Sequence, residues 1–215
     1  MPGPSSQYFA RQPSVASDRR PVRLSLADLE LSLTTDRGVF STERVDPGTR
    51  LLLQEAPHPT DTMGDLLDLG CGYGPIAVSL ARRAPEARIW AVDVNERAVA
   101  LCAENAVANA TDRVHPVVVD DAGTPVAGAP DDMAALPEVR FDGIWSNPPI
   151  RIGKAALHAL LERWLDRLSP GAKAWLVVQR HLGADSLAGW MEGEGWATER
   201  LVSRAGYRLL EVSAR

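Results

Sequence analysis

The stretch that decides the fold is Asp65–Pro75, which reads DLLDLGCGYGP in one-letter code. A short apolar run comes first, closely spaced glycines follow, and helical spacing of apolar residues begins at Ile76. This order predicts a buried strand, a glycine-rich turn and a helix, because glycine lets the backbone turn sharply and approach a ligand closely. On its own the pattern indicates either a nucleotide-like cofactor or a purely structural connection between strand and helix.

The spacing of the glycines favours one class of cofactor. Gly70, Gly72 and Gly74 form G-x-G-x-G, whereas a dinucleotide site needs G-x-G-x-x-G/A. Pro75 therefore stands where a dinucleotide turn would carry its third glycine. The acidic Asp68 before the turn would repel a pyrophosphate but suits a cofactor that carries an ammonium and a sulfonium, such as S-adenosylmethionine.

Carboxylates follow the next two predicted strands. Asp93 lies at the end of the strand predicted for residues 88–94, where a carboxylate accepts hydrogen bonds from both ribose hydroxyls. This supports an adenosine without separating S-adenosylmethionine from a nicotinamide dinucleotide. Asp120 and Asp121 end the strand after that, and we expect Asp121 to contact the adenine amino group, with loop solvation as the alternative for this pair.

Apolar strands alternate with amphipathic helices along most of the chain. Strands are predicted at 65–69, 88–94, 114–119, 141–145 and 174–178, and helices at 76–83, 96–108, 154–168 and 187–193. The alternation is typical of α/β proteins whose parallel sheet is covered on both faces. A closing hairpin at 197–212 adds one antiparallel strand near the end, and we expect residues 120–138 to form a loop with a short helical turn.

A second motif follows the strand predicted at 141–145. Asn147-Pro148-Pro149 offers a carboxamide oxygen and a main-chain carbonyl, and the two prolines stiffen the backbone between them. Two fixed acceptors match the two hydrogens of a planar exocyclic amine and favour a pyramidal nitrogen that can attack a methyl donor. Ligands bind at the carboxyl ends of parallel strands, where the glycine turn, Asp93 and Asn147 all fall.

Composition bounds the remaining function classes. With 45% hydrophobic and 24% charged residues among 215, the chain is an ordinary globular protein. No apolar run approaches the ~20 residues needed to span a bilayer, and no signal core opens the chain, so we expect no membrane partner. Cys71 and Cys102 make no disulfide framework, which fits a reducing cytoplasm, and the histidines and cysteines match no metal spacing. The net charge of −5 means that any basic surface for nucleic acid is local.

The first 60 residues differ from the rest. Residues 1–20, rich in Pro, Ser, Gln and Arg, predict a flexible basic N-terminal arm. Residues 22–34 alternate apolar and polar side chains in two runs, which predicts a β-hairpin. Asp46 and Pro47 then open a short helix, with Asp46 as its N-cap.

Together these motifs resemble the class I S-adenosylmethionine-dependent amino-N-methyltransferases. More narrowly, the sequence is similar to the methyltransferase small-domain family, which includes 16S ribosomal RNA (guanine-N2)-methyltransferases. The narrower match rests on residues 35–41 (TDRGVFS), 45–49 (VDPGT) and 147–154 (NPPIRIGK) and covers roughly residues 7 to 213. The resemblance implies a Rossmann-like α/β fold with a seven-stranded, mostly parallel sheet, whose antiparallel C-terminal strand lies beside the fifth.

The resemblance also implies a site and three parts of the chain. The parts are the arm at 1–20, a hairpin and helix that form a lid at 21–60, and an S-adenosylmethionine-binding domain at 61–215. The implied catalytic residues are Asn147, Pro148 and Pro149. The cofactor-binding residues are Asp68, Gly70, Cys71, Gly72, Gly74, Asp93, Val94, Asp121 and Asn147.

The substrate side departs from the family pattern at one position. Many amino-methyltransferases follow the two prolines with an aromatic residue that stacks on the target base, and this chain has Ile150. We expect Phe40, on the loop that the resemblance places over the cleft, to stack on a base or on adenine. Arg151 and Lys154 are predicted phosphate contacts. Longer family members carry two related halves, and this sequence holds one.

We expect methylation of guanine N2 in ribosomal RNA, with an extruded base as substrate. Three alternatives remain at this point. In the first, the same chemistry acts on a protein glutamine amide or a small-molecule amine. In the second, the fold serves as a non-catalytic binding module. In the third, the chain is a nicotinamide oxidoreductase. Pro75 and the lack of an evident hydride-transfer partner disfavour the last.

Overall fold

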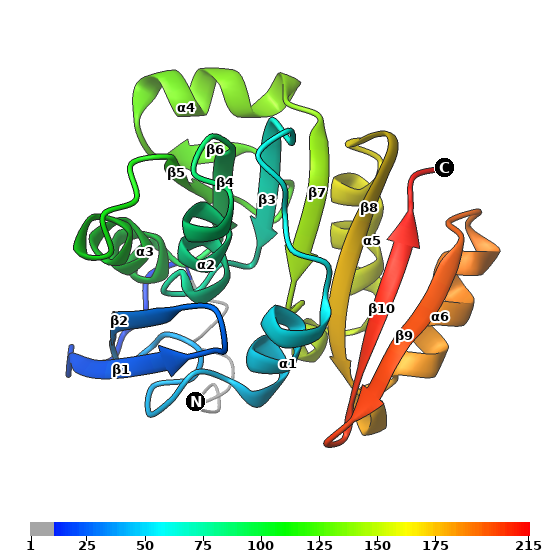
Figure 1. The fold of residues 1–215 in the computed structure, drawn as a ribbon, viewed down its shortest axis with the longest axis horizontal. Helices are drawn as coiled ribbons and strands as arrows, with labels where there is room; N and C mark the ends of the chain where they lie inside the picture. The colour runs from blue at the N-terminus through cyan, green and yellow to red at the C-terminus, as the bar shows by residue number, and fades with distance from the viewer. Residues whose placement is uncertain (1–10) are drawn as a thin grey trace.

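A computed structural model describes residues 11–215 (Figure 1). Residues 1–10 of the predicted arm lie outside this range. The rest of the arm runs beside helix α3 (Glu96–Ala108), where Arg11 and Arg19 pair with Glu96 and Glu104 at 2.7 and 2.8 Å. These four side chains are substantially exposed, so each pair contributes at most about 1 kcal/mol to stability.

Within the described residues, eight strands form the central sheet in the order β6-β5-β4-β3-β7-β8-β10-β9 (Figure 1). Its parallel strands are β5 (Val114–Val119), β4 (Arg88–Asp93), β3 (Asp65–Leu69), β7 (Phe141–Ser146) and β8 (Leu168–Gln179). The C-terminal strand β10 (Tyr207–Ser213) is antiparallel to both of its neighbours, β8 and β9 (Thr198–Arg204). The predicted fold class is confirmed, including the final strand beside the fifth.

The structure differs from the sequence prediction in the segment 120–138 and at one helix end. The segment contains the short strand β6 (Pro125–Ala127), the helix α4 (Pro130–Ala135) and the 3₁₀ turn η2 (Leu136–Glu138), so the sheet gains an edge strand beyond the expected seven. Strand β6 exists because β5 lies beside it, since neither its length nor its composition predicts a strand. Helix α5 (Lys154–Leu165) ends before Leu168, which begins β8.

Helices cover both faces of the sheet, and side chains of one strand alternate between the two layers. Leu66 packs with helices α2 (Pro75–Arg83) and α3, whereas Leu67 packs with α5 and α6 (Ala184–Gly193). Both leucines have no exposed surface. Each contributes about 2 kcal/mol by burial. This double-sided burial explains why the predicted strands are continuous apolar runs.

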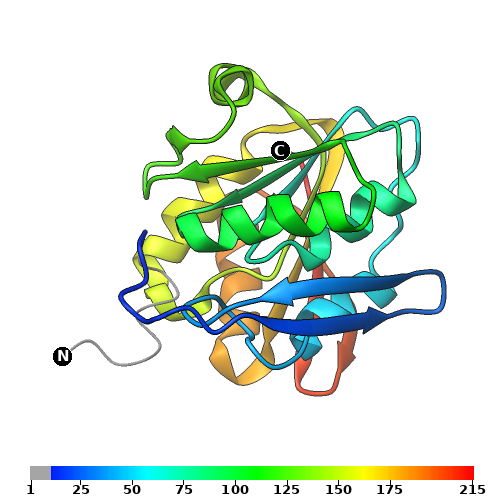
Figure 2. The same cartoon turned by 90° about the vertical axis from the view of Figure 1, so that its left-hand side faces the viewer.

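The N-terminal hairpin packs against the outer side of α3 (Figure 2). Strands β1 (Arg20–Ser25) and β2 (Glu30–Thr35) pair in the predicted alternating register. Asn105 of α3 exchanges two hydrogen bonds with the main chain of Thr34, at 2.7 and 2.8 Å. The chain leaving β2 is thereby directed past the start of α3 and toward the carboxyl ends of the parallel strands.

Helix α1 (Pro47–Glu55) begins where the sequence predicts. The Asp46 side chain caps it by accepting hydrogen bonds from the amides of Gly48 and Thr49 at 2.7 and 3.1 Å. Among residues 11–215, no helix is long and apolar enough to cross a membrane.

Candidate active site

A cavity of about 970 Å³ opens at the carboxyl ends of β3, β4, β5 and β7. The volume lies at the upper end of the range for small-molecule sites. Its wall combines the glycine turn, the end of β4, the Asn-Pro-Pro segment and the loop after β2. The lining includes these predicted site residues: Phe40, Gly70, Cys71, Gly72, Asp93, Val94, Asp121, Asn147, Pro148, Pro149, Ile150 and Arg151.

The glycines of the turn have two different roles. Gly70 and Gly72 have positive φ values of 76° and 54°, and a Cβ atom on either would meet no atom within 4 Å, so their bare backbone faces the cavity. A Cβ on Gly74 would lie 2.7 Å from the Sγ atom of Cys102 in α3. Gly74 does not line the cavity, and it serves the close packing of α2 on α3.

Asp93 holds the glycine turn in place. Its two carboxylate oxygens accept hydrogen bonds from the amides of Gly72 and Asn95, at 2.9 and 3.0 Å. The amides of Gly70 and Cys71 donate to the carbonyl of Val92 in the same strand, both at 2.9 Å. Burial raises the pKa of Asp93 above its ordinary value, and the amide hydrogen bonds oppose that rise.

Asp68 lies behind the turn, and it does not line the cavity. It has no exposed surface, one oxygen accepts a hydrogen bond from the amide of Ala77 at 2.8 Å, and the other has no partner among residues 11–215. Burial raises the pKa of this carboxyl to about 8, helped by the negative charge of Asp93. At neutral pH, the Asp68 carboxyl is therefore protonated in the folded protein.

The two aspartates after β5 have different surroundings. Asp120 closes a turn, because its Oδ1 atom accepts a hydrogen bond from the Thr124 amide at 2.8 Å. Asp121 also lines the cavity, and its carboxylate has no hydrogen-bond or ion-pair partner within residues 11–215. The contact of Asp121 with an adenine amino group stays a prediction.

The Asn-Pro-Pro segment leaves β7 in a tight turn. Pro149 has φ −75° and ψ 71°, the values of an inverse γ-turn, and the Ile150 amide donates to the Pro148 carbonyl at 2.8 Å. A carbonyl oxygen has two lone pairs, so that of Pro148 keeps one for a further donor. The 3₁₀ turn η3 (Ile150–Ile152) then leads into α5.

The amide nitrogen of Asn147 is held from across the chain. Its Nδ2 atom donates to Oδ2 of Asp46 at 2.9 Å and to Oγ1 of Thr49 at 3.0 Å. Asp46 and Thr49 line the same cavity. Sequence reasoning assigned these two residues no part in the site, because separations of 101 and 98 positions leave no local signal.

Tyr73 was also missed, although it lies inside the glycine turn. It lines the cavity with 2% of its surface exposed, and its hydroxyl has no partner among the residues described. Burial and the nearby Asp46 carboxylate raise the pKa of Tyr73 well above its ordinary value. The phenol therefore stays protonated and remains a hydrogen-bond donor.

The side of the cavity where Phe40 and Arg151 lie is more open. Phe40 is 48% exposed, and within residues 11–215 the other large apolar side chain so exposed is Val107 on α3. Arg151 is exposed at the cavity wall and makes no hydrogen bond or ion pair within the described range. Lys154, the first residue of α5, is exposed outside the lining.

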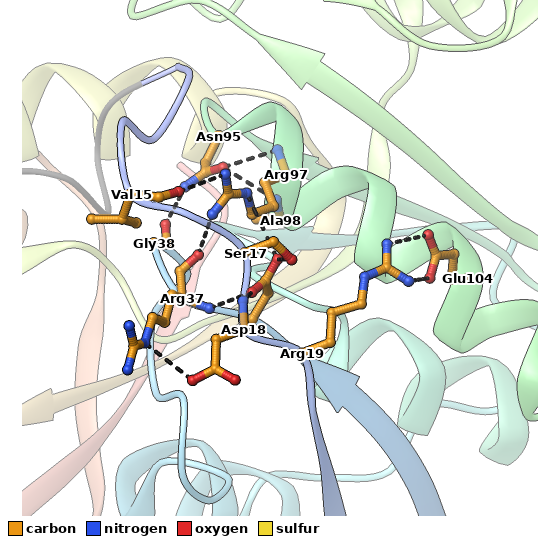
Figure 3. Close-up of polar contacts among 11 residues, drawn as sticks. Val15, Ser17, Asp18, Arg19, Arg37, Gly38, Asn95, Arg97, Ala98 and Glu104 are labelled. Carbon is orange, nitrogen blue, oxygen red and sulfur yellow. Dashed lines mark hydrogen bonds and ion pairs between the residues drawn. The ribbon is translucent and has the colours of Figure 1, made fainter.

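The loop that carries Phe40 is fastened to the start of α3 (Figure 3). Asn95 caps this helix and donates to the carbonyl of Gly38 at 2.8 Å. Arg97 donates to the carbonyls of Arg37 and Val15, at 2.6 and 3.0 Å. Asp93 accepts hydrogen bonds from the amides of Gly72 and Asn95, and Asn95 donates to the loop that carries Phe40. The glycine turn and this loop are therefore held by the same short segment, residues 93–95.

Comparisons with known proteins agree with this geometry. The family model described as methyltransferase small domain matches residues 30–211. "Uncharacterized protein YbxB" of Bacillus subtilis (strain 168) is 38% identical over 182 residues, which cover 85% of each chain. "Ribosomal RNA small subunit methyltransferase C" of Pseudomonas aeruginosa (strain LESB58) is 36% identical over 80% of this chain and 51% of its own length.

A solved structure shares the fold over most of the chain. It is the T. thermophilus 16S rRNA N2 methyltransferase RsmC in complex with AdoMet and guanosine, with a TM-score of 0.73 and 29% sequence identity. The match covers 94% of this chain and 52% of the other. The chain thus spans about half the length of the RNA methyltransferases it matches, and it belongs to the methyltransferase small-domain family.

Proposed function

We propose that the protein is an S-adenosylmethionine-dependent N-methyltransferase that acts on an exocyclic amino group, N2 of guanine in ribosomal RNA. One observation carries the proposal: Asn147, Pro148 and Pro149 line the same cavity as the glycine turn and Asp93. The names of the relatives support a ribosomal RNA acceptor, and the AdoMet and guanosine bound to the T. thermophilus enzyme support the cofactor and the base.

The residues at the cofactor end fit S-adenosylmethionine. Gly70 and Gly72 offer open backbone, and a carboxylate has about four acceptor sites, so Asp93 keeps capacity for ribose hydroxyls beyond its main-chain bonds. Asp121 and Val94 belong to the same wall and complete the adenosine side. When bound, S-adenosylmethionine supplies a methyl group on a sulfonium, and transfer leaves S-adenosylhomocysteine.

The chain activates the acceptor by position. Asn147 Oδ1 and the second lone pair of the Pro148 carbonyl accept the two hydrogens of the amine. The nitrogen becomes pyramidal, its lone pair forms the bond to the methyl carbon, and the carbon–sulfur bond breaks with its electron pair left on sulfur. The extra proton on the methylated nitrogen passes to water, because such an ammonium is acidic.

The open side of the cavity takes the RNA. A stacked base cannot bring its amine to the methyl donor, so the guanine is extruded into the cavity. Phe40 stacks on it in place of the aromatic that Ile150 replaces, and Arg151 and Lys154 contact phosphates. Residues 21–60 act as the lid of this site, and the basic arm at 1–20 adds to the RNA contact.

Methyl transfer from labelled S-adenosylmethionine tests the proposal. The protein is incubated separately with 30S subunits, 50S subunits, naked ribosomal RNA and soluble protein, and the products are digested and identified by mass spectrometry. We expect label in N2-methylguanosine from one ribosomal acceptor. Label confined to protein glutamine would contradict the RNA acceptor, and no calorimetric affinity for S-adenosylmethionine would contradict the enzyme class.

A further inference from the structure

The carboxamide of Asn147 is ordered through its nitrogen. A side-chain amide nitrogen carries two hydrogens, and here one acceptor is a carboxylate oxygen of Asp46 and the other the hydroxyl oxygen of Thr49. With both acceptors at 2.9–3.0 Å, the donor capacity of Nδ2 is used up. The Oδ1 atom has no partner among residues 11–215 and is the end left for a ligand.

The two groups that hold Nδ2 are themselves fixed. The Asp46 oxygen that accepts from Asn147 also accepts from the amides of Gly48 and Thr49, so the start of α1 orients it. A negative charge is favoured at a helix N-terminus. Thr49 is 4% exposed, and Leu51, Leu52 and Leu53 bury the following turn of the helix in the core.

The orientation of this amide determines whether the site can receive an amine. In a flipped amide, Oδ1 would face the Asp46 carboxylate, the two acceptors would repel each other, and the hydrogen bond to Asp46 would be lost. Nδ2 would then meet the N–H groups of the acceptor, and neither partner could accept. The Asp46 carboxylate excludes this arrangement, which an isolated asparagine at the end of β7 would reach by rotation about one bond, and Thr49 adds a second hydrogen bond to the orientation that Asp46 selects.

We propose that Asp46 and Thr49 are positioning residues, and that helix α1 sets which end of the Asn147 carboxamide faces the substrate amine. This inference rests on the proposed amine methylation. It adds that Asp46 and Thr49, which lie 101 and 98 positions before Asn147, control the rate of methyl transfer. It also gives a role to Asp46, which precedes α1 and lines the cavity although it supplies no group that binds the methyl donor.

Thr49→Val tests the inference, because it removes the hydroxyl and keeps the shape and the main-chain amide bound to Asp46. We expect kcat to fall about 5- to 10-fold with the Kd for S-adenosylmethionine unchanged, the effect of one lost hydrogen bond. Thr49→Ser, which keeps the hydroxyl, restores the rate. Thr111→Val is the matched control, since it removes a hydroxyl that bonds the Ala106 carbonyl at 3.0 Å outside the site.

Asp46→Ser gives an independent measurement. Serine still caps a helix. Its shorter side chain loses the carboxylate that reaches Asn147, and we expect kcat to fall roughly 10- to 100-fold, because hydrogen bonds to charged groups are the stronger ones. Equal rates for Thr49→Val and Thr49→Ser, or losses that follow only the melting temperature, would overturn the inference.

A measurement without turnover separates this inference from the proposed function. In the wild-type protein, the side-chain NH2 of Asn147 exchanges slowly with solvent by NMR, and Thr49→Val accelerates that exchange while Thr111→Val does not. If the wild-type protein methylates no acceptor but this protection is observed, the proposed function fails and the positioning contacts stand. If the protein is active and the amide is unprotected in the wild type, the positioning role is wrong.

Discussion

The two ends of the cavity are built in different ways. The cofactor end consists of main-chain groups and buried carboxylates from neighbouring strands, with Gly70, Cys71 and Gly72 bonded to Val92 and Asp93. The acceptor end brings together residues 39–49 and 147–152, which lie about a hundred positions apart in the chain. It presents the exposed Phe40 and the guanidinium of Arg151, which has no partner within residues 11–215.

The contrast shows which properties each end controls. A set of backbone amides fixed by a partly buried carboxylate holds one ligand geometry and tolerates few changes of sequence. A set of side chains carried by a loop and a turn can be exchanged without disturbing the sheet. We therefore expect changes at the cofactor end to alter affinity for the methyl donor and changes at the acceptor end to alter turnover or RNA affinity.

Asn147→Ala gives the largest effect. The substitution removes the carboxamide oxygen that we propose holds the amine, and loss of one preorganised group of this kind lowers kcat by about 10²–10³-fold. Calorimetry with S-adenosylmethionine is expected to give the wild-type Kd within a few-fold. A variant that turns over at the wild-type rate would show that the amine is not held by this side chain.

Asp93→Ala is expected to act on the other end. It removes the acceptor for ribose hydroxyls and releases the amides of Gly72 and Asn95, so the Kd for S-adenosylmethionine rises by roughly 10- to 100-fold. At saturating methyl donor, most of the wild-type kcat returns. Asp142→Ala is the control, because its carboxylate accepts a hydrogen bond from the Gly64 amide at 2.8 Å and lies outside the cavity lining. Unchanged cofactor affinity in Asp93→Ala would break the division between the two ends.

Phe40→Ala separates RNA affinity from chemistry. Stacking on a base contributes ~1–3 kcal/mol, so we expect KM for the RNA to rise by about 5- to 100-fold while the Kd for S-adenosylmethionine holds. Val107→Ala is a matched control, since it shortens the other large apolar side chain that is exposed within residues 11–215, on α3. If methyl-donor affinity falls instead, Phe40 contacts the adenine and belongs to the cofactor end.

Asp68→Asn is expected to leave turnover nearly unchanged, because Asp68 does not line the cavity, and to alter the pH dependence of stability instead. The folded protein keeps a proton on Asp68 up to a pKa of about 8, whereas the unfolded chain releases it near pH 4. Between these values the folded state binds more protons, so wild-type stability falls as pH rises, by at most about 1.4 kcal/mol per pH unit. Above pH 8 this dependence ends.

The measurement is the free energy of unfolding in urea from pH 5 to 9 for wild type and Asp68→Asn. The difference between the two proteins is expected to shift against the wild type up to pH 8 and then level off. The raised pKa of Asp93 acts in the same direction in both proteins and cancels. Parallel curves would mean that Asp68 is ionised throughout.

Much of the sheet followed from the sequence, and the exceptions have physical causes. The strands predicted at 65–69 and 114–119 are short, mostly apolar segments, and both are confirmed. Strand β6 was missed because it depends on pairing with β5 rather than on its own residues. Helix α5 was predicted three residues too long, since Leu168 continues the apolar spacing but pairs with Phe141 in the sheet.

The meeting of the glycine turn with Asp93 was predictable, because β3 and β4 are consecutive parallel strands whose carboxyl ends lie at the same edge of the sheet. The sequence by itself determined the α/β fold, the turn and the two acceptors of the Asn-Pro-Pro segment. Only the tertiary structure decided that Asp46 and Thr49 hold the Asn147 amide, that Asp68 is buried behind the turn, and that Asn95 and Arg97 fasten the loop carrying Phe40. Such contacts join segments whose separation leaves no periodic trace, so they exist only once the sheet has placed both partners.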